Sequence, residues 1–351
     1  MKLGIIGLPQ SGKTTIFNAV SGQVVAVGDY SRAEHRAVVK VPDHRVEDLF
    51  SIAESKKLTH AEIEFLDSTA FTGKGKKSSG ELGNVHDLRL LDAFAIVIDD
   101  FSNDAQPEHD LQAIVDEMIL ADLMVIENNL DKLSRSIKLT GKKDRAHEAE
   151  LLKICLDALN NEKMLSEIGL IEKDAKELRG YSFLSLKPQL VVFNISEKKL
   201  SDAEKIYGEY SKFKINGIRD ISVMCGKLQM ELSQLPEEER LEFQKEMNIK
   251  QLALERFIQK SYELLGLISF FTLGAPETRA WTIKRGTAAP QAAGAIHTDF
   301  ERGFIRAEVA TFEDYMKYKS LPALKTAARL RVEGKDYIVK DGDVILFLFN
   351  V

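Results

Sequence analysis

The chain has 351 residues, of which 44% are hydrophobic and 29% are charged, and this balance excludes disordered and fibrous proteins. Its formal net charge of -6 excludes a polycation that coats nucleic acid along its whole length. Cys155 and Cys225 are too few for a disulfide scaffold or a zinc site, so both are expected to be buried thiols in a reducing compartment. No apolar run approaches the ~20 residues that span a bilayer, and the apolar start breaks at Gln10, unlike a signal peptide. We therefore expect a soluble cytoplasmic protein of two or three domains.

The N-terminal segment carries the most specific motif of the chain. Residues 3–7 (LGIIG) predict a short buried strand of a parallel sheet. Residues 7–14 (GLPQSGKT) then satisfy the pattern G-x-x-x-x-G-K-[ST], and a helix is predicted directly after them. In such a loop backbone N–H groups converge on phosphate oxygens, Lys13 reaches the β and γ phosphates, and Thr14 offers a hydroxyl to Mg²⁺. We expect Lys13 and Thr14 to act in catalysis by positioning phosphate and metal, and we assign no general base.

Three later segments are predicted to be buried strands whose carboxyl ends carry polar residues. They are residues 61–67, which end at Asp67, residues 93–98, which precede Asp99, and residues 189–193, which precede residues 194–197 (NISE). Asp67 is expected to hold a magnesium-bound water. Ligands bind beyond the carboxyl ends of such parallel strands, so these segments predict one nucleotide site at one edge of the sheet.

A long segment without strand signals separates Asp99 from Asn194. Hydrophobic residues recur at three- and four-residue steps over residues 111–137 and again over 151–178. Between them lies a polar interruption with four basic residues, Lys138, Lys142, Lys143 and Arg145. The pattern predicts two antiparallel helices with a basic tip. The tip is either a solvated turn without a partner or a surface for RNA phosphates.

The sequence pattern changes from helical to strand-like at Leu267. Short strand-like runs, separated by Gly, Asp and Pro turns, are expected at residues 269–273, 280–283, 305–309, 337–339 and 344–349, with one helix over 311–320. They predict a compact α+β module with a slight excess of basic residues and no catalytic constellation of its own.

These residues resemble the Obg-like ATPase (YchF) family of P-loop proteins over essentially the whole chain. The stretches that carry the resemblance are residues 7–9 with the P-loop, 41–43 (VPD), 82–84 (LGN), 194–197, 279–283 (RAWTI), 292–294 (AAG), 296–300 (IHTDF) and 334–339 (GKDYIV). The resemblance implies an α/β, G-domain-like P-loop NTPase with a mostly parallel sheet, an inserted antiparallel helical hairpin and a C-terminal TGS domain of β-grasp type. It also implies Mg²⁺-dependent nucleotide hydrolysis and association with the ribosome. On this chain the expected domains are nucleotide-binding over residues 1–105 and 184–266, hairpin over 106–183, and TGS over 267–351.

The chain departs from the family pattern at several positions. Gln10 replaces an asparagine that helps to place a monovalent cation in related enzymes, which argues against a potassium requirement. Ser31 keeps a hydroxyl at the metal-sensing position of the first switch, although its neighbours differ. Ala70 and Phe71 stand where the second switch of the family has glycine and leucine. Because alanine resists the positive φ angles that glycine adopts freely, we expect hydrolysis to be slow.

The base-recognition loop leaves the choice of nucleotide open. Guanine-selective relatives carry Asn-Lys-x-Asp, whose aspartate accepts from guanine N1–H and from the 2-amino group, whereas Ile195 and Glu197 replace the lysine and the aspartate here. Adenine has an acceptor at N1, so Glu197 must point elsewhere if ATP is preferred. The resemblance favours ATP, and the side chains keep GTP as the alternative. The residues expected at the nucleotide are Gln10, Ser11, Gly12, Lys13, Thr14, Thr15, Asn194, Ile195, Glu197, Met224, Cys225 and Gly226, and those expected at the metal are Thr14, Ser31 and Asp67.

We therefore expect a cytoplasmic, Mg²⁺-dependent protein that prefers ATP over GTP, hydrolyses it slowly and regulates translation or a stress response on the ribosome. Its basic tip and C-terminal module are expected to contact ribosomal RNA phosphates, and neither membrane nor DNA is an expected partner. One alternative is a nucleotide-binding adaptor that has lost hydrolysis. Another is an RNA-binding module whose nucleotide site only stabilises the fold.

Overall fold

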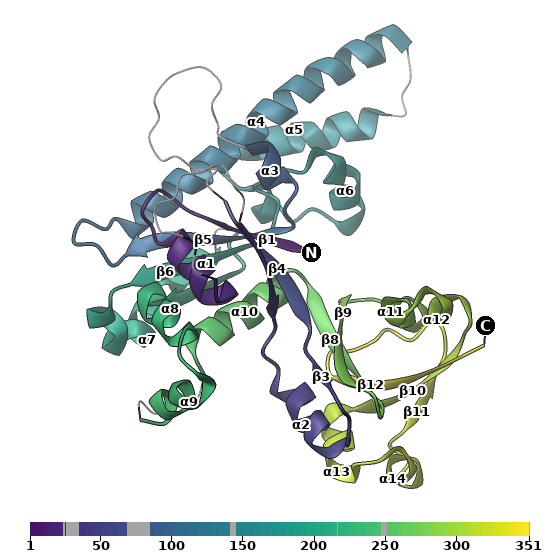
Figure 1. The fold of residues 1–351 in the computed structure, drawn as a ribbon. Helices are drawn as coiled ribbons and strands as arrows, with labels where there is room; N and C mark the ends of the chain where they lie inside the picture. The colour runs from purple at the N-terminus through teal and green to yellow at the C-terminus, as the bar shows by residue number, and fades with distance from the viewer. Residues whose placement is uncertain are drawn as a thin grey trace. The chain divides into compact units, whose positions relative to one another are not determined.

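The structure, a computed structural model, describes residues 1–23, 25, 35–68, 85–140, 145–215, 217–246 and 251–350, with the backbone alone at 136–140, 172 and 215. The chain divides into two compact units (Figure 1). Unit 1 comprises Met1–Ala37 and Glu64–Leu264, and unit 2 comprises Val38–Ile63 and Leu265–Val351.

Unit 1 is built on a six-stranded sheet. Its order is β2 (His35–Lys40), β4 (Glu62–Asp67), β1 (Lys2–Ile6), β5 (Ala93–Asp100), β6 (Gln189–Ile195) and β7 (Asp220–Met224), with the unit boundary falling inside β2 and β4. The pairings from β4 through β7 are all parallel. The parallel sheet predicted from the apolar segments is therefore confirmed. Asn194 pairs with Met224, so the loops that follow β6 and β7 leave the sheet side by side.

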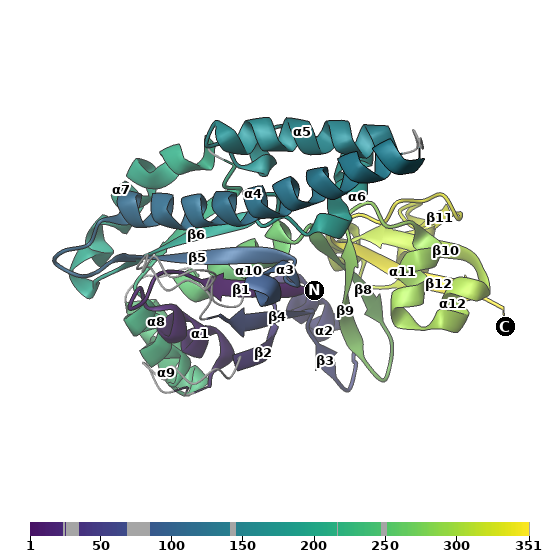
Figure 2. The ribbon, with the colours of Figure 1, turned by 90° about the horizontal axis from the view of Figure 1, so that it is seen from above.

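Helices cover both faces of this sheet (Figure 2). One face carries α1 (Lys13–Ser21), α8 (Gly226–Ser233) and α10 (Ala253–Leu264), and the other carries α4 (Pro107–Thr140) and α5 (Ala146–Asn160). The apolar stripe of α4 supplies Ile114 and Met118 to one core with Ile96 of β5 and Phe193 of β6. The remaining helices of the unit are α3 (Val85–Arg89), α6 (Glu172–Glu177), α7 (Ala203–Tyr210) and α9 (Glu237–Glu246), and its 3-10 turns are Leu165–Glu167, Leu178–Tyr181, Glu197–Asp202 and Ser211–Ile215.

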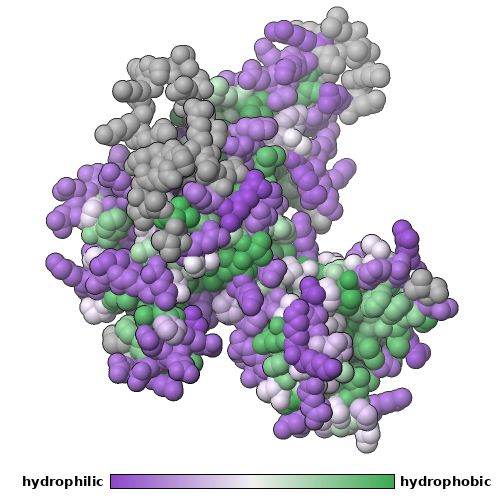
Figure 3. Space-filling view, viewed as in Figure 1, coloured by the Kyte–Doolittle hydropathy of each residue, from purple (hydrophilic) through white to green (hydrophobic). Residues whose placement is uncertain are grey.

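The inserted hairpin forms between β5 and β6, with α4 and α5 packed against each other. The second helix of the hairpin, α5, is shorter than the hydrophobic stripe over residues 151–178 predicted. It ends at Asn160, and Glu162 shortly after it adopts a left-handed φ of 57°. The apolar residues beyond it enter the core through a 3-10 turn at Leu165 instead. On the face shown in Figure 3 the hairpin presents mainly hydrophilic side chains, as expected of helices that bury a single stripe.

Unit 2 holds a mixed six-stranded sheet. Its order is β11 (Arg331–Glu333), β10 (Phe304–Thr311), β12 (Asp343–Phe349), β8 (Leu267–Leu273), β9 (Thr278–Lys284) and β3 (Leu58–Thr59). Its helices are α2 (His44–Ile52), α11 (Ala289–Ile296), α12 (Thr298–Arg302), α13 (Phe312–Tyr318) and α14 (Leu321–Thr326). Small residues of α11, Ala289, Ala292 and Ala293, pack against the sheet core around Phe270. The prediction of a strand at residues 337–339 is wrong. Ile338 makes only an isolated bridge to Ala288, and the strand that pairs with β10 at this edge of the sheet is β11.

Residues 38–63, which the sequence analysis placed within residues 1–105 of the nucleotide-binding domain, pack in unit 2 with the C-terminal residues. Strand β3 pairs in parallel with β9, and the Thr278 amide donates to the Lys57 carbonyl at 2.9 Å. The Arg45 guanidinium of α2 donates to Asp341 at 2.8 Å and lies 5.3 Å from the centre of the Phe271 ring. The C-terminal module is thus completed by a segment from the N-terminal third of the chain.

The predicted burial of the two cysteines is confirmed, since Cys155 and Cys225 are both free and buried. Burial raises the pKa of the Cys155 thiol to about 11, which keeps it protonated and unreactive. Among the helices of the described ranges, none combines the length and the apolar character needed to cross a bilayer.

Candidate functional site

The P-loop connects the end of β1 to the start of α1. Gly12, at the N-terminus of α1, has a φ of 90°, and a Cβ there would lie 2.2 Å from Nδ2 of Asn194. Only glycine permits both that left-handed conformation and that close approach. Gln10 also takes a positive φ of 67°, and the Ser11 amide donates to the Leu8 carbonyl at 3.3 Å. The loop therefore has the tight turn and the open helix N-terminus that phosphate binding requires.

Lys13 and Thr14 face Asp67 at the end of β4. The Thr14 hydroxyl donates to Oδ2 of Asp67 at 2.9 Å, and the Lys13 ammonium donates to the Leu8 carbonyl at 2.9 Å. Burial lowers the pKa of Lys13, and the negative charge of Asp67 partly opposes this shift. Burial likewise raises the pKa of Asp67, against the hydrogen bond from Thr14 and the charge of Lys13. A group of opposite charges is thus held partly out of water at the P-loop.

This arrangement fits a divalent cation. Asp67 is 6% exposed, and no described residue donates a hydrogen bond to its buried Oδ1 atom. A carboxylate oxygen and a hydroxyl oxygen are the hard donors that Mg²⁺ prefers, and a cation beside Asp67 would offset the desolvation of its charge. Ser31, the third residue expected at the metal, lies outside the described residues, as do Ala70 and Phe71.

Asn194 joins the base-recognition loop to the P-loop. Its Nδ2 donates to the Ser11 carbonyl at 3.1 Å, and its Oδ1 accepts from the Gly226 amide at 2.9 Å. Gly226 is closely packed, since a Cβ there would lie 3.0 Å from Ile16 and 3.1 Å from Asn194. One buried amide therefore fixes three loops of the predicted site relative to one another.

The other residues expected at the base divide into buried and exposed ones. The side chains of Ile195, Met224 and Cys225 are buried in the unit interior, so only their main chain is available to a base. Glu197 instead lies at the surface, where Oε1 of its carboxylate is 3.0 Å from the Lys227 ammonium. Thr15 follows Thr14 in the first turn of α1 and is partly buried.

Three contacts of this region were not expected from the sequence. Lys227, the second residue of α8, holds the Glu197 carboxylate. Lys199 donates to the carboxylate of Asp100 at 2.6 Å, and the Tyr210 ring stacks on Phe193 with ring centres 3.8 Å apart. A lysine that follows a strand closely is too common in sequences to predict its partner, and nothing in the sequence pattern pairs Tyr210 with Phe193.

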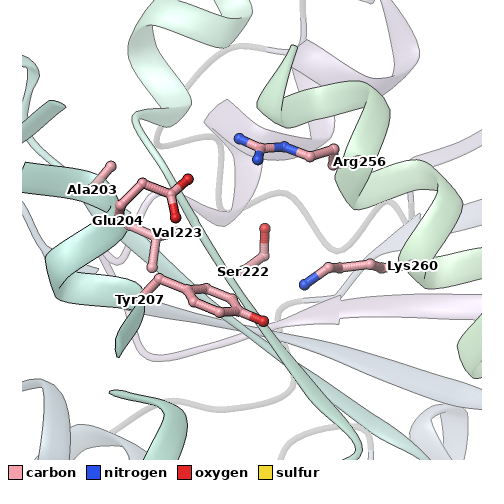
Figure 4. A pocket seen from close by; sticks show the side chains of 7 residues that line it. All are labelled: Ala203, Glu204, Tyr207, Ser222, Val223, Arg256 and Lys260. Atoms are coloured by element: carbon pink, nitrogen blue, oxygen red, sulfur yellow. The ribbon is translucent and has the colours of Figure 1, made fainter. Parts of the chain in front are cut away.

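A separate cavity of about 270 Å³ opens at β7, between α7 and α10 (Figure 4). The Ser222 hydroxyl points into it, and Arg256 extends toward the side that carries Glu204. Lys260 is occupied by the Ile221 carbonyl at 2.7 Å and by Asp220 at 2.9 Å. This cavity contains none of the P-loop residues, so the candidate site stays at the ends of β1, β4, β6 and β7.

Sequence comparison places the chain among known proteins. It is 36% identical over 371 residues to the ribosome-binding ATPase YchF of Escherichia coli O157:H7, covering 100% of this chain and 99% of that protein. It is 35% identical over 363 residues to the protein of the same name from Bacillus subtilis (strain 168), with 99% of each chain covered. The chain belongs to the YchF family.

Two further likenesses agree with this membership. The solved structure of the Schizosaccharomyces pombe YchF GTPase matches with a TM-score of 0.84 and 28% identity, over 99% of this chain and 97% of that one. A C-terminal YchF-GTPase family model, described as a protein of unknown function (DUF933), matches residues 267–350. The resemblance and the α/β P-loop fold class inferred from the sequence are therefore confirmed. The names of these YchF proteins differ in the nucleotide: the bacterial relatives are called ATPases, and the fission-yeast protein is called a GTPase.

Proposed function

We propose that this YchF-family chain is a cytoplasmic, Mg²⁺-dependent nucleoside triphosphatase that prefers ATP to GTP and acts with the ribosome in translation or a stress response. The observation that carries the proposal is the pairing of Thr14, beside Lys13 in the P-loop, with Asp67 at 2.9 Å. Full-length similarity to proteins named ribosome-binding ATPases supports the choice of ATP and of the ribosome.

Several residues at the P-loop would together bind the triphosphate and its metal ion. Lys13 exchanges the Leu8 carbonyl for phosphate oxygens, and the amides at the start of α1 donate to the same group. Thr14 and Asp67 would hold Mg²⁺, with Ser31 as a proposed third ligand. When bound, the metal neutralises charge on the β and γ phosphates. The site thus binds and orients the reacting groups.

Hydrolysis in this proposal is slow. Ras and Gα proteins orient the attacking water with a glutamine near the second switch, and this chain has Phe71 at that place. With positioning as the only catalytic device that we assign, turnover is expected below about 1 per second, under the ordinary enzyme range.

Titration of ATP and GTP into the protein with magnesium, followed by a phosphate-release assay, tests the proposal. Lys13→Ala should weaken ATP binding at least a hundredfold, about 2.8 kcal/mol, because a charge-assisted bond in a partly desolvated loop is lost. Lys153→Ala, which removes an exposed lysine of α5, is the matched control and should bind as the wild type does. Unchanged ATP binding by Lys13→Ala would place the site elsewhere. Tighter binding of GTP than of ATP would reverse the proposed nucleotide preference. Binding without phosphate release would favour a nucleotide-binding adaptor that has lost hydrolysis.

Co-sedimentation with ribosomes tests the partner. Contacts with RNA phosphates release condensed counterions, so binding should weaken steeply as salt rises. The basic tip is one proposed surface: Lys138 lies in the last turn of α4, Arg145 forms a 3.0 Å ion pair with Glu148, and Lys142 and Lys143 fall outside the described residues. Sedimentation that is absent, or indifferent to salt, would count against ribosome binding through RNA. If the affinity for ribosomes does not depend on the nucleotide state, this would favour an RNA-binding module in which the nucleotide only stabilises the fold.

A further inference from the structure

The ion pair between Glu197 and Lys227 lies at the rim of the proposed base site. Glu197 opens the 3-10 turn Glu197–Asp202 behind β6, and Lys227 lies in the first turn of α8 behind β7. Asn194 Oδ1 accepts from the amide of Gly226, the residue directly before Lys227, so both partners sit on the loops that Asn194 ties to the P-loop. The pair is therefore part of the loop cluster that would surround a base.

The chemistry of the two purines makes this pair consequential. Guanine presents two donors on one edge, N1–H and the 2-amino group, which a free carboxylate can accept together. Adenine presents an unprotonated N1 acceptor there and has no 2-amino group, so the same carboxylate would repel it. A free carboxylate at this loop thus favours guanine, and one engaged by a cation no longer does.

Lys227 is placed to engage the carboxylate in this way. Its Nζ is 3.0 Å from Oε1 of Glu197, and the two side chains are 66% and 52% exposed. A second carboxylate, that of Glu231 one turn along α8, lies 3.8 Å from the same ammonium. Both carboxylates raise the pKa of Lys227, Glu197 chiefly through its hydrogen bond, so the ammonium stays charged at neutral pH.

We propose that Lys227 sets the base preference of the site by holding the Glu197 carboxylate away from the base edge. The inference rests on the proposed function and adds a specificity-determining residue to it. Lys227 is a positioning residue, since it acts through Glu197 rather than on the nucleotide.

The test measures dissociation constants for ATP, GTP and inosine triphosphate with magnesium. Lys227→Ala should shift the ratio of ATP to GTP affinity about fivefold toward GTP, which corresponds to about 1 kcal/mol. Inosine triphosphate, which keeps N1–H but lacks the 2-amino group, should gain less than GTP. Because the side chain is exposed, the variant should fold as the wild type does, and its thermal unfolding midpoint checks this.

Two backgrounds separate this role from a general charge effect. In Glu197→Gln the amide cannot accept as a carboxylate does, so adding Lys227→Ala should leave the ratio unchanged. Glu231→Gln removes the second carboxylate near Lys227 and should keep the wild-type ratio. A Lys227→Ala ratio that moves less than twofold, moves toward ATP, or moves equally in the Glu197→Gln background would overturn the inference.

The failure of this inference is distinct from failure of the proposed function. If the wild type binds no triphosphate, or if Lys13→Ala binds normally, the proposed site is wrong and both fall. If Lys13→Ala abolishes binding while Lys227→Ala leaves the ratio unmoved, the site stands and the role of Lys227 alone is refuted.

Discussion

Replacing Asp122 by alanine should destabilise unit 1 by about 4 kcal/mol. Asp122 lies in α4 and is fully buried. It accepts from the Arg89 guanidinium at 3.0 Å, from the Leu184 amide at 3.0 Å, and from the amide and hydroxyl of Ser185 at 2.8 Å each. One carboxylate thus connects the end of α3, the inserted hairpin and the segment that returns from it to β6.

The magnitude follows from what alanine would leave behind. Arg89, whose side chain is 15% exposed, would lose its carboxylate, and breaking a buried pair by removing one partner costs about 3–5 kcal/mol. Arg89 keeps its bonds to the Ala121 and Ser182 carbonyls, which moderates this cost. The amides of Leu184 and Ser185 would lose their acceptor, at about 1–3 kcal/mol for each group left unsatisfied. Partial relaxation around the smaller side chain keeps our expectation at about 4 kcal/mol, a large share of the roughly 5–15 kcal/mol that stabilises a domain.

Urea unfolding followed by far-ultraviolet circular dichroism gives the free energy, because the signal comes mainly from helices. Trp281 lies in unit 2, so its fluorescence does not report on this network. Hydrogen exchange at the Leu184 amide supplies the local readout and should speed up. The double variant Arg89→Met with Asp122→Leu removes the stranded cation but not the orphaned amides, so it should recover only part of the loss. A loss under about 1 kcal/mol, or full recovery in the double variant, would refute the reasoning, since the amides would then be satisfied without the carboxylate.

Three further changes test other parts of the chain. Gly12→Ala places a Cβ 2.2 Å from Asn194 Nδ2 at a φ of 90°, and calorimetric titration should show at least a tenfold loss of triphosphate affinity, about 1.4 kcal/mol. Burial lowers the pKa of Lys187 to about 8 in the folded protein. Between about pH 8 and the pKa of the unfolded chain, the unfolded state binds one more proton, so the free energy of unfolding rises with pH. Unfolding measured across that range should show this rise in the wild type and not in Lys187→Met. Ala70→Gly, outside the described residues, should raise phosphate release by freeing positive φ at the second switch, and an unchanged or lower rate would contradict that explanation of slow turnover.

Local patterns made the P-loop and the hairpin predictable from the sequence. The pattern of an apolar strand, a glycine-containing turn and a helix spans only a few consecutive residues, and the hydrophobic stripe of α4 repeats along the helix. The pair of Glu197 and Lys227 could not be predicted, because its partners are 30 residues apart and exposed charges carry no periodicity. Helix α11 was missed because it is only eight residues long and the residues it buries, Ala289, Ala292 and Ala293, are too small to stand out as a hydrophobic stripe. Which of the expected residues bind nucleotide remains a prediction that the titrations above test.

The C-terminal fold is completed by residues from near the start of the chain, and this limits how it can be separated. A fragment of residues 267–350 would contain β8, but it would lack α2, whose Arg45 lies over the buried Phe271 ring. It would also lack β3, leaving β9 as a bare sheet edge of the kind that pairs with other chains. Arg45 and Asp341 are 296 positions apart, so no single cut or graft keeps them together. Any fragment or graft meant to preserve this module must therefore include both residues 38–63 and residues 265–351.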